Sequence, residues 1–251
     1  MTWLNATTVV FQRELRMNIK KPAWIIVGLL QPVLYLFLFG PLLKPLASQL
    51  GTDDIYRFFV PGLLVQMGFI GLMAVGFGVL ADKRFGVIDS QRVTPAPRSA
   101  LLMGRVGRDV VSMLVQALIM IVLGTIIGMR ANLLGVLIGL VLCLLLGIAA
   151  STGSYALALI LGSEMSMAPI VNGLMLPILL LSGILLPTDI GPTWLRVVGN
   201  IMPTHYVVEG LRSAFAGDIA SLTTLWGVIA AVALAVAGTW WGTATFARRS
   251  E

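Results

Sequence analysis

Side chains that usually carry chemistry are few in this chain, and they form no recognisable catalytic or metal-binding motif. There is one histidine, His205, and one cysteine, Cys143, whereas a metal site needs a cluster of His, Cys or carboxylate ligands. A nucleotide-binding P-loop needs a lysine directly after a glycine. The four lysines all follow other residues: Lys20, Lys21, Lys44 and Lys83. We therefore expect a protein that is not an enzyme and has no metal site or cofactor of its own.

Four amide side chains inside long apolar segments are the next candidates for function. Each is costly in lipid unless it faces protein or water. A pathway for a transported molecule would use such groups, but hydrogen bonds between neighbouring helices would use them equally well. The candidates for a translocation pathway are Gln31, Gln66, Gln116 and Asn172.

The composition requires elements that are surrounded by lipid. Apolar residues make up 58% of the 251 residues before the 27 glycines are counted, and charged residues only 11%. A typical soluble domain is about 45–50% apolar with glycine included and about 25% charged. Six continuous apolar segments are near or above the ~20 residues that a helix needs to cross the hydrocarbon core. Since they do not alternate as barrel strands do, we predict an all-α polytopic membrane protein. It forms one domain over 1–251, with spans near 23–43, 59–80, 110–129, 133–161, 168–186 and 222–246.

Lysine and arginine are unevenly divided between the two sides that this topology creates. With six spans both termini face one side, which also carries the connection 81–109. That side holds twelve basic residues and the opposite side holds five. Because short basic loops stay in the cytoplasm, we expect both termini there, with the chain in the inner (cytoplasmic) membrane of a bacterial cell. The net charge of +6 is then explained by the basic residues that orient the chain in the membrane, and we expect no nucleic-acid partner.

Residues 1–22 contain too many polar side chains for a signal peptide, and instead predict an amphipathic helix. Arg13, Arg16 and Lys20 fall in one sector of a helical wheel, with bulky apolar side chains on the other side, and Val9 and Glu14 break the pattern. We expect a helix that lies in the membrane interface with its basic face towards anionic headgroups. A solvated leader into the first span is the alternative.

The connection 81–109 mixes basic and apolar side chains. Its first half predicts a short helix that ends near Val93, because Pro95 and Pro97 remove the N–H donors that would continue it. Ser99 is placed to cap the approach to the third span. Apolar side chains beside the charges are typical of a helix that docks on another protein, whereas a loop that served only topology would not need them.

The connection 187–221 predicts two short amphipathic helices, separated by Pro203 and too short to span. Trp194 and Tyr206 have the amphipathic rings that gather at membrane interfaces. Glu209 and Arg212 are three residues apart and close enough to pair on a helix. We therefore expect a re-entrant helical pair in the outer leaflet, between the fifth and sixth spans.

These features together resemble the type-2 permease family of ATP-binding-cassette (ABC) exporters, and most closely the daunorubicin-resistance type of drug-exporter permease. The likeness covers essentially the whole chain. Its first group of motif residues is Gly86, Thr94-Pro95 and Gly104-Arg105. Its second is the stretch from GILLPTDIGPTWLRVV to MPTHYVVEGLRSAFAG, between the fifth and sixth spans.

The resemblance implies partners for this chain. It implies two copies of a separate ABC ATPase, which bind ATP and magnesium, and a second permease that is either an identical copy or a related chain. Through the connection 81–109, a coupling helix would contact the ATPase with Arg84, Gly86, Asp89, Arg92, Thr94 and Pro95. Glu164, in the next loop on that side, is a second possible contact.

The chain departs from the family pattern around the loop glycine. Family members commonly place Glu and Lys around that glycine and Thr directly after it, whereas Arg84, Phe85 and Val87 stand here. Asp89 still supplies an acidic position.

The function that we predict is the permease subunit of an ATP-driven exporter of an amphipathic drug-like molecule or lipid, taken from the cytoplasm or inner leaflet. The fifth predicted span has no aromatic residue, whereas sugar-polymer exporters of the family line their channel with aromatic rings. Export of a lipid-linked glycan or polysaccharide is the alternative within the family. An ATP-independent secondary transporter or channel is the alternative of another class, but it would normally carry ionisable side chains at mid-span positions, and these predicted spans have none there.

Overall fold

The structure is a computed structural model that describes residues 2–20, 23–46, 54–85, 97–185 and 191–249, and every regular element in these ranges is helical. The helices are α1 (Trp3–Ile19), α2 (Ala23–Leu43), α3 (Ile55–Gln66), α4 (Gly76–Arg84), α6 (Arg98–Ile127), α7 (Leu133–Leu161), α8 (Glu164–Leu181), α9 (Thr193–Ile201), α10 (Pro203–Ala216) and α11 (Leu222–Arg249). Five of the described helices are long and apolar enough to cross a membrane: α2, α6, α7, α8 and α11. The prediction of an all-α polytopic membrane protein is confirmed.

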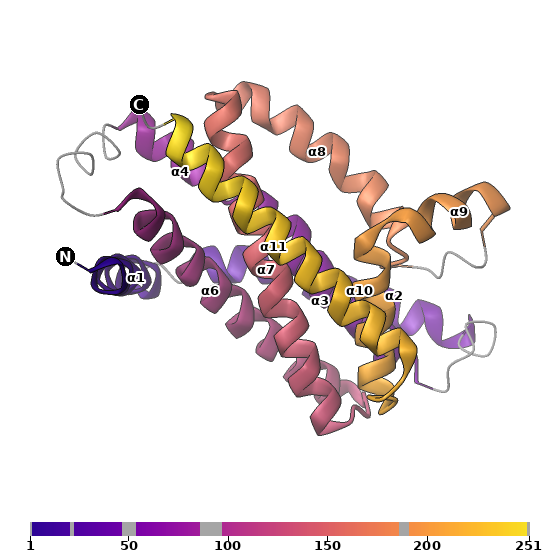
Figure 1. The fold of residues 1–251 in the computed structure, drawn as a ribbon. Coiled ribbons are helices and arrows are strands. Elements are labelled where there is room, and N and C mark those ends of the chain that lie inside the picture. Colours follow the sequence, from indigo (N-terminus) through magenta and orange to yellow (C-terminus); the bar gives the residue numbers. More distant parts are fainter. Residues whose placement is uncertain (1, 21–22, 47–53, 86–96, 186–190, 250–251) are drawn as a thin grey trace.

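The segment predicted as one span at 59–80 is a broken helix. α3 ends at Gln66, a π-helical turn (η2) follows over Met67–Gly71, and α4 starts at Gly76. The Ser154 hydroxyl of α7 accepts a hydrogen bond from the Gly76 N–H at 2.9 Å and donates one to the Met73 carbonyl at 2.6 Å. Backbone groups that a break exposes within lipid need such partners. Together α3, η2 and α4 run along the bundle, as a single span would (Figure 1).

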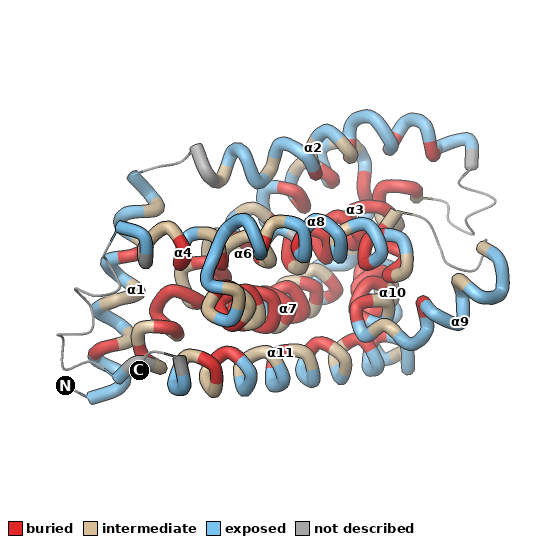
Figure 2. The backbone as a smooth tube through the Cα atoms, turned by 90° about the horizontal axis from the view of Figure 1, so that it is seen from above, coloured by how far each residue is buried: buried red, intermediate tan, exposed pale blue. Residues whose placement is uncertain are grey.

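α7 is the centre of the bundle and packs on α11, α6, α10 and α4. Figure 2 shows it mostly buried, whereas α2 and α8 are largely exposed. Of the five long apolar helices described, α7 is the most buried, and α2 and α8 are the least. Since lipid is as apolar as a side chain, close packing of small residues holds such helices together. At Gly135 of α7, for example, a Cβ atom would lie 1.8 Å from the Ala214 carbonyl oxygen of α10.

Both termini lie at one end of the bundle, as an even number of passes along it requires (Figure 1). We call this the terminal end. α1 lies across it and is seen nearly end-on in the view that shows α6, α7 and α11 from the side. The turns from α6 to α7 and from α10 to α11 lie at the opposite end.

The third span begins earlier than its apolar run predicts. α6 starts at Arg98, so residues expected in a loop before Val110 are helical. The predicted cap at Ser99 is wrong: the residue before the helix is Pro97, which makes no side-chain cap. The Ser99 hydroxyl instead accepts a hydrogen bond from the Trp3 indole at 3.0 Å. Of the coupling helix that we expected over 81–93, residues 81–84 form the end of α4, and residues 86–93 lie outside the described residues.

The predicted helical pair in 187–221 is present as α9 and α10, and Pro203 is the first residue of α10. The two helices meet different surroundings. α9 leaves Trp194 and Ile201 exposed, whereas α10 buries Leu211 and Phe215 completely. α9 therefore forms an apolar edge of the molecule, and α10 is part of the core.

Candidate coupling and translocation sites

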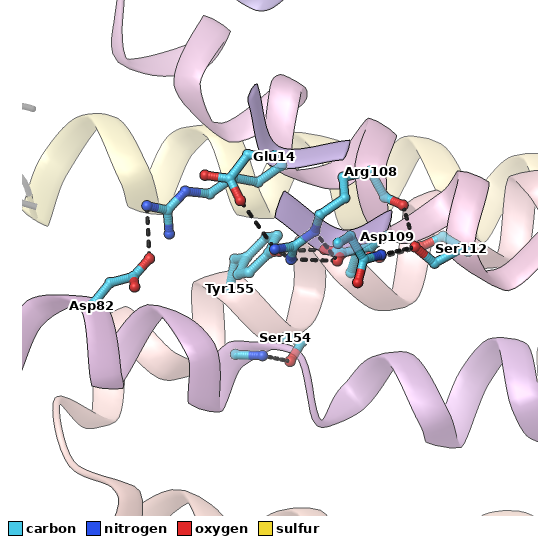
Figure 3. Close-up of polar contacts among 12 residues, drawn as sticks. Glu14, Asp82, Arg108, Asp109, Ser112, Ser154 and Tyr155 are labelled. Carbon is cyan, nitrogen blue, oxygen red and sulfur yellow. Dashed lines mark hydrogen bonds and ion pairs between the residues drawn. The ribbon is translucent and has the colours of Figure 1, made fainter. Parts of the chain in front are cut away.

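A cluster of charged side chains joins three helices near the terminal end (Figure 3). The Arg108 guanidinium of α6 lies 3.1 Å from the Glu14 carboxylate of α1 and 2.5 Å from the Asp109 carboxylate. The Tyr155 hydroxyl of α7 donates a hydrogen bond to Asp109. Glu14, Asp109 and Tyr155 are all at most 7% exposed. Two carboxylates thus share one guanidinium in nearly dry surroundings.

Two further polar contacts extend this cluster along the same end of the bundle. Arg105 of α6 pairs with Asp82 of α4 at 2.9 Å, and the Asn18 amide of α1 donates to the Ser112 hydroxyl of α6 at 2.5 Å. The Asp82 side chain is 38% exposed, so water screens the Arg105–Asp82 pair, whereas the Glu14 side chain that pairs with Arg108 is only 9% exposed. These contacts therefore fix α1 and α4 onto the beginning of α6.

Sequence reasoning missed this cluster for a specific reason. It placed the start of the third span at Val110 and so assigned Arg105, Arg108 and Asp109 to a loop. It also treated Glu14 as a break in the amphipathic pattern of the first helix, although Glu14 lies on the face that contacts α6. The available signal was an Arg-Asp pair next to a long apolar run, together with a lone acid on the apolar side of a basic helix.

Two of the predicted ATPase contacts lie at the terminal end. Arg84 is exposed at the last turn of α4, and Glu164 is the exposed first residue of α8. Figure 1 places both helix ends on the side that holds the two termini. The other predicted contacts fall outside the described residues: Gly86, Asp89, Arg92, Thr94 and Pro95.

The four candidates for a translocation pathway do not line one common surface within this chain. Gln31 is exposed on α2 and donates to Tyr35 of the same helix, at 3.2 Å. Asn172 is exposed on α8. Gln116 of α6 donates to the Ile25 carbonyl of α2 at 3.2 Å and so joins two helices. Gln116 thus makes a hydrogen bond between neighbouring helices, the alternative to a role in transport, whereas Gln31 and Asn172 face away from the core.

Gln66 differs from the other three because it is buried at the break in the second predicted span. Its side chain belongs to a residue that is 3% exposed, and its Oε1 atom has no hydrogen-bond partner in the described part of the chain. The π-helical turn begins at the next residue, and π-helical turns occur frequently at functional sites.

Arg212 of α10 is the most connected side chain at the opposite end of the bundle. Its guanidinium donates to the Phe58 carbonyl of α3 at 3.1 Å and to the Gly183 carbonyl after α8 at 2.8 Å. It pairs with Glu209 at 2.6 Å, as the spacing predicts, and stacks 3.7 Å from the centre of the Phe58 ring. Burial lowers the pKa of Arg212 from its ordinary value, and the Glu209 carboxylate opposes that shift.

Other motif residues of the same stretch explain why α10 packs so closely. A Cβ atom at Gly210 would lie 2.8 Å from the Gly227 Cα atom of α11, so only glycine allows this contact. Gly217 ends α10 with a φ angle of +99°, a conformation that glycine adopts without strain. Tyr206 donates to the Asn200 carbonyl of α9 at 2.8 Å. The motif thus builds a junction of α3, α8, α9, α10 and α11.

Polar contacts among the described residues thus join the helices at both ends of the bundle. Because five of the described helices are long and apolar enough to cross a membrane, the chain is a polytopic helical membrane protein. A family model for the ABC-2 type transporter matches residues 5–216. The chain belongs to this family of transport permeases, whose members are membrane components rather than catalytic subunits.

The individual relatives that the chain resembles are also named as transport permeases. The putative transport permease ycf38 of Cyanophora paradoxa is 28% identical over 197 residues, which cover 77% of this chain and 68% of the relative. The protein of that name from Porphyra purpurea is 26% identical over 201 residues, with the same two coverages. The daunorubicin resistance ABC transporter permease protein DrrB1 of Streptomyces coeruleorubidus is 24% identical over 198 residues, which cover 78% of this chain and 70% of the relative.

Proposed function

We propose that this chain is the permease subunit of an ATP-driven exporter, and that a separate ABC ATPase hydrolyses the ATP with magnesium. The observation that carries the proposal is the match to the ABC-2 family over residues 5–216. The sequence adds support, since its lysines do not form a P-loop. ATP-driven closure of two ATPase copies would favour one conformation of the permease over another. A nucleotide can shift this equilibrium only if it binds one of the two states more tightly.

The terminal end is the proposed contact with the ATPase. Arg84 and Glu164 are exposed there. The ion pairs Arg105–Asp82 and Arg108–Glu14 tie α4 and α1 to α6. A push on the connection between α4 and α6 would therefore move several helices as one unit. With the basic residues of this end in the cytoplasm, the chain lies in the inner membrane of a bacterial cell.

We infer that the pathway forms between two permease copies. α2 and α8 are the least covered of the long described helices, and they carry the exposed Gln31 and Asn172. A second copy, identical or related, would cover such faces and bring polar groups to a shared path. Gln66 would meet that path only through the break between α3 and α4.

The proposed substrate is an amphipathic drug-like molecule or a lipid. The DrrB1 relative is named for daunorubicin resistance. α8 has no aromatic side chain on which sugar rings would stack. It carries the exposed Met165 and the partly exposed Met175, whose side chains adapt to varied apolar ligands, whereas Met167 is buried in the core. The test is ATPase activity of the reconstituted complex with panels of hydrophobic drugs, lipids and lipid-linked glycans. Stimulation by drugs or lipids is expected, and stimulation by glycans alone would instead favour the alternative of a polysaccharide exporter.

Charge reversal in the coupling connection is expected to separate ATP hydrolysis from transport. In the double variant Arg84→Glu/Arg92→Glu, repulsion replaces attraction at the proposed ATPase contact, so we expect transport to fall at least about tenfold, from ~1.4 kcal/mol or more of lost coupling. The measurement compares transport per ATP hydrolysed in reconstituted vesicles. Arg130→Glu, an exposed residue at the opposite end, is the matched control and should retain coupling. Unchanged assembly and unchanged transport in the double variant would refute this contact.

A further inference from the structure

One face of α1 packs on α6, and this contact fixes how α1 is rotated about its own axis. Ala6 and Glu14 are buried on that face. Val10 packs so closely on α6 that a Cβ atom at Gly104 would lie 2.7 Å from it, and the Phe11 ring lies 3.0 Å from the Cβ position of Gly107. Because Glu14 is paired with Arg108 on the same face, the other faces of α1 have defined directions.

A second face of α1 is a basic groove that no carboxylate of the described residues neutralises. The groove is lined by Val9, Gln12, Arg13, Arg16, Met17 and Lys20. Its three cations are exposed and have no carboxylate partner among the described residues. The only acid of α1 is Glu14, which is turned towards Arg108. This face therefore presents three exposed positive charges beside two apolar side chains.

A third face of α1 is aliphatic and uncovered. Leu4 and Ile19 are each 68% exposed. α1 lies across the ends of the long helices rather than along them (Figure 1). A helix in this orientation, with an aliphatic face beside a basic one, is suited to the boundary between headgroups and acyl chains. The sequence-based expectation of two faces is thus refined to three.

We propose that the groove of α1 binds the phosphate headgroup of an anionic phospholipid in the leaflet at the terminal end. Arginine forks match phosphate oxygens with paired hydrogen bonds, and lysine adds a point charge. Val9 and Met17 would contact the apolar part of the same lipid. Charge complementarity and the adjoining aliphatic face favour a lipid over a soluble anion.

The test counts lipids bound to the intact permease by native mass spectrometry, during titration with phosphatidylglycerol or phosphatidylcholine. Each basic residue near a membrane surface contributes about a fivefold attraction for anionic lipid. The variant Arg13→Gln/Arg16→Gln/Lys20→Gln should therefore lose at least about tenfold of the preference for phosphatidylglycerol. The single variants Arg13→Gln and Arg16→Gln should give partial losses. Arg130→Gln, exposed at the opposite end, is the matched control and should keep the full preference.

The outcomes separate a lipid site from the alternatives. All exchanged side chains are exposed and lie off the face that contacts α6, so the thermal midpoint should not change. An unchanged lipid preference in the triple variant would overturn the proposal. If the triple variant kept its lipid preference and also no longer bound the ATPase, the groove would instead be a binding site for the protein partner.

Discussion

Replacing Arg212 with leucine should lower the free energy of unfolding by about 3 kcal/mol, because each buried carbonyl group that loses its hydrogen-bond donor costs about 1–3 kcal/mol. The guanidinium satisfies carbonyl groups of Phe58 and Gly183, which lose their donor when it is removed. The Glu209 side chain is 35% exposed, so water can partly replace its lost partner, and we assign little of the effect to that pair. Thermal unfolding of the purified permease, followed by tryptophan fluorescence, measures the change.

Two variants separate the contribution of the backbone contacts from that of the ion pair. Arg212→Lys keeps the charge but not the planar fork that reaches several acceptors, so it should fall between the wild type and Arg212→Leu. Glu209→Gln removes only the partly exposed pair and should cost about 1 kcal/mol or less. If Arg212→Leu unfolded at the same temperature as Glu209→Gln, the bonds to α3 and to the end of α8 would contribute nothing.

An acid at position 211 should have a still larger effect. Leu211 is fully buried in α10, where an aspartate would remove a packed side chain and place an unpaired carboxylate among apolar groups. The cost of Leu211→Asp should exceed ~4 kcal/mol, enough to abolish the folded protein. The measurement is the yield of monodisperse permease after extraction from membranes.

Leu211→Met is the matched control for this experiment, since it conserves volume and polarity and should cost less than ~1.5 kcal/mol. It should be recovered at close to the wild-type yield. A normal yield of Leu211→Asp would mean that this part of α10 is solvated, contrary to the structure.

The sequence was sufficient for those parts of the fold that depend on long apolar runs. The helices near 133–161 and 222–246 follow directly from length and hydropathy, and both are present as α7 and α11. The Glu209–Arg212 pair followed from helical spacing alone and is confirmed at 2.6 Å. Local rules succeed here because every interacting group lies on the same helix.

The parts that were missed depend on contacts between distant segments. The apolar run 59–80 gives no sign that Ser154, far along the chain, holds a break in it. The partners of Arg108 and Asp109, Glu14 and Tyr155, come from two other helices. Of the four polar span residues, the sequence could not tell that Gln116 faces α2 while Asn172 is exposed. Polarity predicts that a partner exists, but only the packing identifies the partner.

Transport by the reconstituted complex tests the central claim most directly. The permease is purified together with any P-loop ATPase that binds it, placed in vesicles, and supplied with the drug or lipid that most stimulates ATP hydrolysis. We expect the compound to accumulate across the membrane only when both ATP and the ATPase are present, and to stop when the P-loop lysine of the ATPase is replaced. Equal accumulation by the permease alone, or the reproducible absence of a P-loop ATPase from the purified protein, would contradict the account.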